Sequence, residues 1–252
     1  MTASGGARRQ RYSCLAALAC LLACGPGGGG SAGEGGAEPE ARAGARAGQA
    51  RAEAESPAPM GVVLFLGTSL TAGYGLTQDE AYPARVQEHI DAAGLPFRVV
   101  NAGVSGDTSA GGLRRLDWLL RQPVAVLVLE LGANDMLRGL GIEAMRGNLQ
   151  EIVDRTRAEH PGVRLVVAGM RAAPNLGEGY GAAFEASYPE LAEKNGGVLI
   201  PFLLDGVAAD PELNQADGIH PTAEGQRIVA GTVWGVLEPV LRGAIQGASP
   251  RG

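Results

Sequence analysis

The sequence predicts an α/β fold in three layers, α/β/α, with a five-stranded parallel sheet between two layers of helices. Three observations lead to this prediction. Short apolar runs recur along residues 60–243, amphipathic stretches separate them, and most of the runs are followed by a polar segment rich in glycine. Runs without polar alternation are typical of strands buried on both faces, and strands that alternate with helices form parallel sheets.

Five segments are expected to form the strands. Each is short and apolar, most are rich in β-branched residues, and none has the length of a typical helix. In chain order they are residues 61–66, 97–100, 124–129, 163–168 and 198–200.

Apolar residues that recur every three or four positions predict helices, because this spacing gives a helix one buried face. The expected buried residues are Leu113, Leu116, Leu119 and Leu120 in one helix, Ile142, Met145, Leu149, Ile152 and Val153 in another, and Ile228, Val229, Val233, Val236, Leu237, Val240 and Leu241 in the last. Pro221 suits the first position of a helix, so we expect the last helix to begin there, with His220 as its N-cap.

Residues 1–23 are expected to be a signal peptide. Three arginines form a basic region, and the apolar run at 14–23 is too short to span a bilayer. Residues 21–24, Leu-Leu-Ala-Cys, resemble the lipobox of bacterial lipoproteins. The resemblance implies lipidation of Cys24 and an exported protein that is anchored to a membrane and faces the periplasm or the cell surface. The alternative is an ordinary signal peptide and a soluble secreted protein.

Residues 24–59 are expected to form a disordered tether. They are mostly Gly, Ala, Glu, Arg and Pro, with no aliphatic side chain larger than Ala, so they cannot bury enough apolar area to offset the entropy of ordering. Residues 60–243 then have the size of a single domain with one substantial core. Residues 244–252 are expected to be a flexible tail.

Composition excludes several classes of site. All three cysteines, Cys14, Cys20 and Cys24, lie in or directly after the predicted signal peptide, so the domain has no disulfide and no thiolate chemistry. Removal of residues 1–23 takes away three arginines and no acidic residue, which changes the formal charge from −6 to −9. This charge repels phosphate backbones, so we expect no nucleic-acid partner. The first strand is also not followed by a nucleotide-binding glycine motif.

The polar segments after the strands are the expected location of the functional site, because ligands bind at the carboxyl ends of the strands in such a sheet. Ser69 follows the first strand, Gly106 the second and Asn134 the third. Asp217 and His220 follow the last strand, three residues apart. At this spacing the carboxylate can hold the imidazole so that the other ring nitrogen acts as a base.

Together, these segments resemble the sequence blocks of the SGNH hydrolases, also called the GDSL-like lipase and acylhydrolase family. The matching phrases are Gly67-Thr68-Ser69-Leu70, residues 101–108 around Gly106, Gly132-Ala133-Asn134-Asp135 and Asp217-Gly218-Ile219-His220. The resemblance is closest to the bacterial arylesterase, lysophospholipase and acyl-CoA thioesterase subgroup. It implies the flavodoxin-like fold of that family and a serine esterase that hydrolyses small carboxylic esters, lipid esters or thioesters.

The resemblance also implies a role for each site residue. Ser69 would be the nucleophile, His220 the general base and acid, and Asp217 the residue that orients the imidazole. The oxyanion would be bound by the backbone N–H groups of Ser69 and Gly106 and by the side-chain amide of Asn134. No metal and no other cofactor is expected.

Thr68 departs from the family pattern, because the first block usually has an aspartate there. We expect a retuned site rather than an inactive one. The subgroup resemblance further implies that the loops after the third block and after the fourth strand line an acyl pocket. The expected acyl-chain contacts are Met136, Leu137, Leu140 and Leu176. The polar residues at 107–109 precede a predicted helix and are assigned to capping rather than catalysis.

Three alternatives stay open. An α/β-hydrolase shares the chain order Ser, acid, His, but its nucleophile elbow requires Gly-Xaa-Ser-Xaa-Gly, and the first block has threonine at the last of these positions. A carbohydrate O-deacetylase on the same fold is opposed only weakly, by the aromatic content of 4%. A non-catalytic surface lipoprotein is suggested by Thr68 and opposed by the presence of the other block residues.

Overall fold

A computed structural model of the protein describes residues 59–248. The predicted signal peptide, the tether up to residue 58 and residues 249–252 lie outside the described residues. The expectations for Cys24 and for membrane anchoring therefore fall outside the described part of the chain.

The five predicted strands form one parallel sheet. They are β1 (Gly61–Gly67), β2 (Phe97–Gly103), β3 (Val124–Glu130), β4 (Arg164–Ala168) and β5 (Val198–Ile200). Their order is β2-β1-β3-β4-β5, and every neighbouring pair is parallel. This is the flavodoxin-like doubly wound order, which confirms the predicted fold class.

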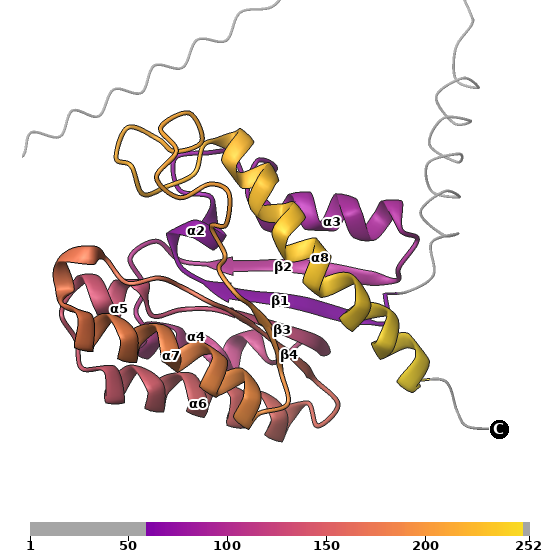
Figure 1. The fold of residues 1–252 in the computed structure, drawn as a ribbon. Coiled ribbons are helices and arrows are strands. Elements are labelled where there is room, and N and C mark those ends of the chain that lie inside the picture. The colour runs from indigo at the N-terminus through magenta and orange to yellow at the C-terminus, as the bar shows by residue number, and fades with distance from the viewer. Residues whose placement is uncertain (1–58, 249–252) are drawn as a thin grey trace, which may run out of the picture. The chain divides into compact units, whose positions relative to one another are not determined.

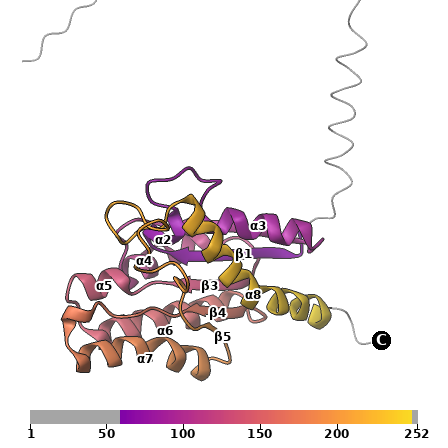
Figure 2. The same ribbon diagram turned by 45° about the horizontal axis from the view of Figure 1, so that its top comes forward.

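Helices cover both faces of this sheet (Figures 1 and 2). One face carries α3 (Tyr82–Ala92) and α8 (Ala223–Ala248), and the other carries α4 (Ser109–Leu119), α6 (Ile142–Glu159) and α7 (Glu178–Lys194). Successive side chains of a strand point to opposite faces. In β1, for example, Val63 and Phe65 belong to the core beneath α3 and α8, whereas Leu64 and Leu66 belong to the core beneath α4, α6 and α7.

Short elements gather at the carboxyl ends of the strands. The helices α2 (Ser69–Ala72) and α5 (Ala133–Leu137) begin directly after β1 and β3, and the 3₁₀ turn η1 (Pro174–Leu176) lies between β4 and α7. Figures 1 and 2 show α2 beside the long loop that precedes α8. Polar segments that are far apart in the sequence therefore meet at one edge of the sheet.

The boundaries of α8 differ from the predicted ones at both ends. The helix begins at Ala223, and the Thr222 hydroxyl accepts a hydrogen bond from the Gly225 N–H at 3.3 Å, so the N-cap is Thr222 and not His220. Pro221 instead forms an isolated antiparallel bridge with Asn214. The predicted tail from residue 244 is also wrong as far as Ala248, because Ile245 and its neighbour Ala244 still pack against the core and extend the helix.

Candidate active site

Ser69, Asp217 and His220 form a continuous hydrogen-bonded chain. Ser69 is the first residue of α2, whereas Asp217 and His220 lie in the loop between β5 and α8. The Nε2 atom of His220 lies 2.8 Å from the Ser69 Oγ, and its Nδ1 lies 2.6 Å from the Asp217 Oδ2. Because Nδ1–H donates to the carboxylate, Nε2 is left to accept the hydroxyl proton of Ser69.

Hydrogen-bond donors hold the exposed Asp217 carboxylate in its ionised form. Its Oδ1 accepts hydrogen bonds from the backbone N–H groups of His220 at 3.0 Å and Ile219 at 2.9 Å. The His220 backbone N–H first, then the His220 ring and the Ile219 N–H, hold the pKa of Asp217 far below its usual range. The carboxylate is therefore charged at neutral pH, when an imidazolium cation forms beside it.

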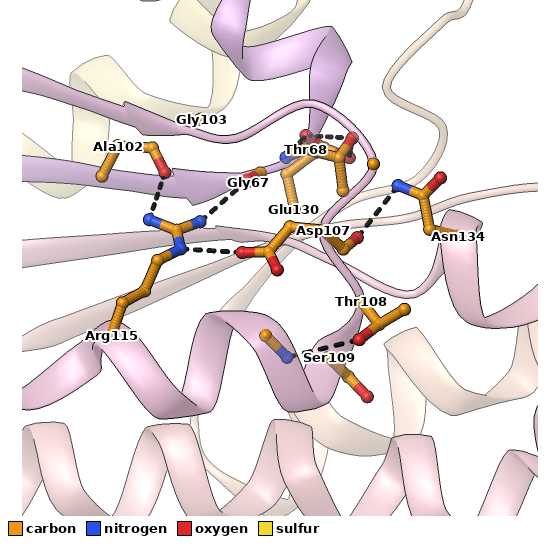
Figure 3. A network of polar contacts seen from close by, with 12 residues as sticks. Gly67, Thr68, Ala102, Gly103, Asp107, Thr108, Ser109, Arg115, Glu130 and Asn134 are labelled. Carbon is orange, nitrogen blue, oxygen red and sulfur yellow. Dashed lines mark hydrogen bonds and ion pairs between the residues drawn. The ribbon is translucent and has the colours of Figure 1, made fainter. Parts of the chain in front are cut away.

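Gly106 and Asn134 supply hydrogen-bond donors near the turn that carries Ser69. Gly106 has a φ of +78°, a conformation that disfavours any side chain. The Asn134 amide donates to the carbonyl of Asp107 at 2.9 Å, and its second N–H hydrogen stays available (Figure 3). Within residues 59–248, the backbone N–H groups of Ser69 and Gly106 donate to no protein acceptor.

Arg115, on α4, fixes the two loops that carry these donors. Its guanidinium donates to the carbonyl of Ala102 at 2.6 Å, to the carbonyl of Gly67 at 3.0 Å and to the Asp107 carboxylate at 2.8 Å (Figure 3). The ends of β1 and β2 and the loop after β2 thus share one planar donor group. Such a rigid fork holds its acceptors in a defined geometry.

A buried carboxylate accepts hydrogen bonds from the turn that carries Ser69. Glu130, the last residue of β3, is 0% exposed and accepts hydrogen bonds from the Thr68 N–H at 2.7 Å and from the Thr68 hydroxyl at 2.9 Å. The Thr71 hydroxyl donates to the same carboxylate at 2.7 Å. Burial raises the pKa of Glu130 in spite of these donors. A side chain at Gly67 would collide with Glu130 and Thr71, so glycine is required where the turn crosses the carboxylate.

The sequence profile of the GDSL-like lipase/acylhydrolase family matches residues 65–228. The chain belongs to this family. Family membership makes the protein an enzyme that hydrolyses esters. The matched residues include all three members of the hydrogen-bonded chain and both further donors.

Two characterised relatives and one solved structure are similar to this chain and are named as esterases or thioesterases. Esterase TesA of Pseudomonas aeruginosa is 39% identical over 180 residues, which are 71% of this chain and 89% of TesA. Thioesterase 1/protease 1/lysophospholipase L1 of Escherichia coli is 38% identical over 73% of this chain and 86% of its own. The psychrotrophic esterase EstA from Pseudoalteromonas sp., in a crystal structure inhibited by monoethylphosphonate, is 33% identical with a TM-score of 0.67, over 72% of this chain and 99% of EstA.

Thr68 is the residue at which this member of the GDSL-like family departs from the usual first block. Its side chain is 1% exposed and points to Glu130, as Figure 3 shows. A neutral donor suits this position, because an aspartate there would place a second carboxylate against the buried one. The hydroxyl therefore satisfies Glu130 without adding charge.

The residues assigned to capping lie around the start of α4. The Thr108 side chain accepts a hydrogen bond from the Gly111 N–H at 3.3 Å and is the N-cap. Asp135 accepts from the Ser109 N–H at 2.7 Å and from its hydroxyl at 2.6 Å, so a carboxylate on α5 also covers the start of α4. Asp107 was assigned to the cap as well, but its carboxylate pairs with Arg115 instead.

The four leucine and methionine residues expected to contact an acyl chain are not equivalent. Leu137 and Leu140 are 58% and 42% exposed beside the carboxyl edge of the sheet, and Leu176 is partly buried in η1. Met136, in contrast, is 7% exposed and packs in the core together with Met145 of α6. Of the four residues, Met136 is therefore the one whose side chain is buried in the core.

Sequence reasoning assigned no role to Glu130, Arg115 or Arg138. Arg138 donates to the carbonyl of Gly106 at 2.6 Å and so holds a peptide group within the loop between β2 and α4. The one signal in the sequence was Glu130, a single charge at the end of an otherwise apolar strand. Nothing in the local sequence distinguishes Arg115 and Arg138 from surface arginines.

Proposed function

We propose that the protein is a serine esterase that forms an acyl-enzyme on Ser69. The observation that supports this proposal is the unbroken hydrogen-bonded chain from Asp217 through His220 to Ser69. Its substrates are proposed to be aryl esters, lysophospholipids or acyl thioesters, since the relatives carry the names esterase and thioesterase/lysophospholipase.

The reaction follows from the geometry of the three residues. The Ser69 Oγ attacks the carbonyl carbon while its proton passes to the Nε2 of His220, and the ionised Asp217 stabilises the imidazolium. The tetrahedral intermediate then collapses, and His220 returns the proton to the departing alcohol or thiol. Water, deprotonated by the same imidazole, attacks the acyl-enzyme and releases the acid and free Ser69.

The oxyanion of each tetrahedral intermediate is proposed to bind to three donors. They are the backbone N–H groups of Ser69 and Gly106 and the free N–H of the Asn134 amide. Donors that are already fixed before the reaction stabilise the developing charge without reorganisation. Arg115 and Arg138 hold the loops of two of these donors in place.

A fluorophosphonate probe tests the nucleophile directly. The purified protein should hydrolyse short-chain nitrophenyl esters without added metal and take up one phosphonyl group, located on Ser69 by peptide mass spectrometry. Ser69→Ala should lower kcat by about 10⁵-fold or more and abolish labelling. Ser105→Ala is the control, because Ser105 lies in the same site region without a base, and it should label fully. Full activity of Ser69→Ala would exclude this mechanism.

Leu137, Leu140 and Leu176 are proposed to contact the acyl chain of the substrate. Leu137 ends α5, Leu140 follows it and Leu176 ends η1, and these segments come after the carboxyl ends of β3 and β4. Truncation to alanine should shift the preferred chain length in a nitrophenyl ester series, whereas the same truncation of exposed Trp118 should not. An unchanged preference in all three variants would remove this assignment.

We also propose that the protein is exported and anchored to a membrane through a lipid on Cys24. The lipobox-like residues before this cysteine support the proposal. Mass spectrometry of the mature N-terminus should find a diacylglyceryl modification on Cys24, and Cys24→Ala should release the protein from membranes. A mature chain with a free Cys24 thiol, or one that begins after residue 24, would contradict the anchor.

A further inference from the structure

The side chain of Gln215 connects the two halves of the proposed active site. Gln215 lies in the loop between β5 and α8, two residues before Asp217. Its amide nitrogen donates to the carbonyl of Tyr74 at 2.7 Å and to the carbonyl of Pro221 at 3.0 Å. An amide NH₂ group has two hydrogens, so these two carbonyls use both of them.

Gln215 also closes the turn that carries the acid and the base. Its backbone N–H donates to the carbonyl of His220 at 2.7 Å, and its own carbonyl accepts from the Gly218 N–H at 2.8 Å. Together with the side-chain bond to Pro221, these contacts tie Gln215 to the far end of the turn, residues 215–221. The turn is otherwise exposed at Asp217, Gly218 and Ile219.

Tyr74 makes the connection to the nucleophile. Its N–H donates to the carbonyl of Ser69 at 3.0 Å, and its ring centroid lies 4.5 Å from that of the His220 imidazole. The bond from Gln215 to the Tyr74 carbonyl therefore links the segment after Ser69 with the turn of His220. The two segments are 141 positions apart along the chain from Tyr74 to Gln215.

We propose that Gln215 is a positioning residue that sets the distance between the Ser69 Oγ and the His220 Nε2. This inference rests on the proposed function, because that function makes Ser69 the nucleophile and His220 the base. Proton transfer between them requires hydrogen-bond distance, and a misplacement of about 1 Å typically costs about 10²-fold in rate. One side chain that donates to both segments at once fixes this distance better than either loop alone.

Gln215→Glu tests the proposal, because glutamate has the same length but offers no donor to the two carbonyls. We expect kcat for a nitrophenyl ester and the rate of phosphonylation of Ser69 to fall by about 10- to 100-fold, with KM changed by no more than about 2-fold. Gln215→Met, which adds no charge, should have the same effect, and it decides the matter if the glutamate variant does not fold. Gln122→Glu is the matched control at the other end of the sheet. The Oε1 of Gln122 accepts a hydrogen bond from Arg98 at 3.2 Å, and a glutamate at this position can accept the same bond.

A second background separates positioning from a general structural role. In His220→Ala there is no base to position, so Gln215→Glu should reduce the residual rate by less than about 2-fold, as expected for residues that act as one unit. An equal reduction in both backgrounds would overturn the inference. The inference would also be overturned if folded Gln215→Glu and Gln215→Met both kept the wild-type kcat while Ser69→Ala was inactive. Full activity of Ser69→Ala would instead overturn the proposed function itself.

Discussion

At the residue scale, Asn134 has one structural contact and one proposed chemical contact. Its amide is held by the Asp107 carbonyl at 2.9 Å, which leaves one donor for the oxyanion. We expect Asn134→Ala to lower kcat by about 10²–10³-fold with little change in KM, because a donor that acts mainly in the transition state is lost. Steady-state kinetics on a nitrophenyl ester measure this effect. A loss below about 5-fold in a folded variant would exclude Asn134 from the oxyanion site.

Burial of Glu130 makes its contribution to stability depend on pH. Its pKa is raised above the ordinary value of 4.5 by burial, so the unfolded chain releases this proton at lower pH than the folded protein does. The contribution of Glu130 to the free energy of unfolding therefore decreases as pH rises from about 4.5 through its raised pKa. Below that window the contribution does not change with pH.

Glu130→Gln should remove this dependence. Relative to the wild type, the variant should gain stability as pH rises from about 4.5 through the raised pKa of Glu130. Urea unfolding at a series of pH values measures the difference in free energy of unfolding. Exposed Glu193→Gln is the control and should follow the wild-type curve. Two results would contradict the assignment. The difference in free energy of unfolding between Glu130→Gln and wild type could stay constant with pH, or the variant could lose stability relative to wild type as pH rises.

At the scale of secondary-structure elements, the ends of β1 and β2 and the loop after β2 depend on one side chain of α4. Arg115→Met keeps the apolar stem but removes three hydrogen bonds and leaves the Asp107 carboxylate, with a side chain only 12% exposed, without its cation. We expect a loss of about 2–4 kcal/mol in the free energy of unfolding, together with a lower kcat. Urea unfolding and kinetics measure the two effects.

The neighbouring Arg114 provides the matched control on the same helix. It is exposed, so Arg114→Met should change stability by no more than about 0.5 kcal/mol. Equal effects of the two substitutions would mean that the guanidinium contacts of Arg115 contribute nothing specific.

At the level of the whole protein, the site combines residues at the ends of strands with an exposed turn, residues 216–219, in the loop before α8. Ser69 and Asn134 follow the inner strands β1 and β3, and Gly106 follows the edge strand β2 beside them, whereas Asp217 and His220 lie in a long loop without strands or long helices. Regions with few buried apolar contacts open at lower free energy than the core does. We therefore expect the acid and base to separate from Ser69 before the sheet unfolds.

A urea titration followed by two probes checks this expectation. Esterase activity and fluorophosphonate labelling should be lost at lower urea concentration than the far-UV circular dichroism signal. A control titration monitors the fluorescence of Trp118 and Trp234, which should follow the circular dichroism. Coincident curves for activity and secondary structure would show instead that the loop and the sheet unfold as one unit.

Sequence patterns alone were enough to predict the five strands, most of the helices and the identity of the five block residues. Apolar periodicity reports burial and element type locally, so the five strands and the buried stripe of α8 could be predicted without knowledge of their partners. Ser69 and His220 were recognisable because each lies in a short phrase of the family. Local rules failed where a long-range contact competed with them, as at Pro221, whose bridge to Asn214 moved the start of α8 to Ala223.

How these pieces meet depends on contacts between segments that are distant in the chain. Glu130 lies beneath Thr68 because β1 and β3 are neighbours in register, with Gly67 opposite Glu130, and no pattern within either strand encodes that pairing. Arg115 and Gln215 likewise act on segments far from them in the chain. Hydrogen bonds between distant segments depend on strand order and register, which are properties of the assembled sheet and not of any one stretch of sequence.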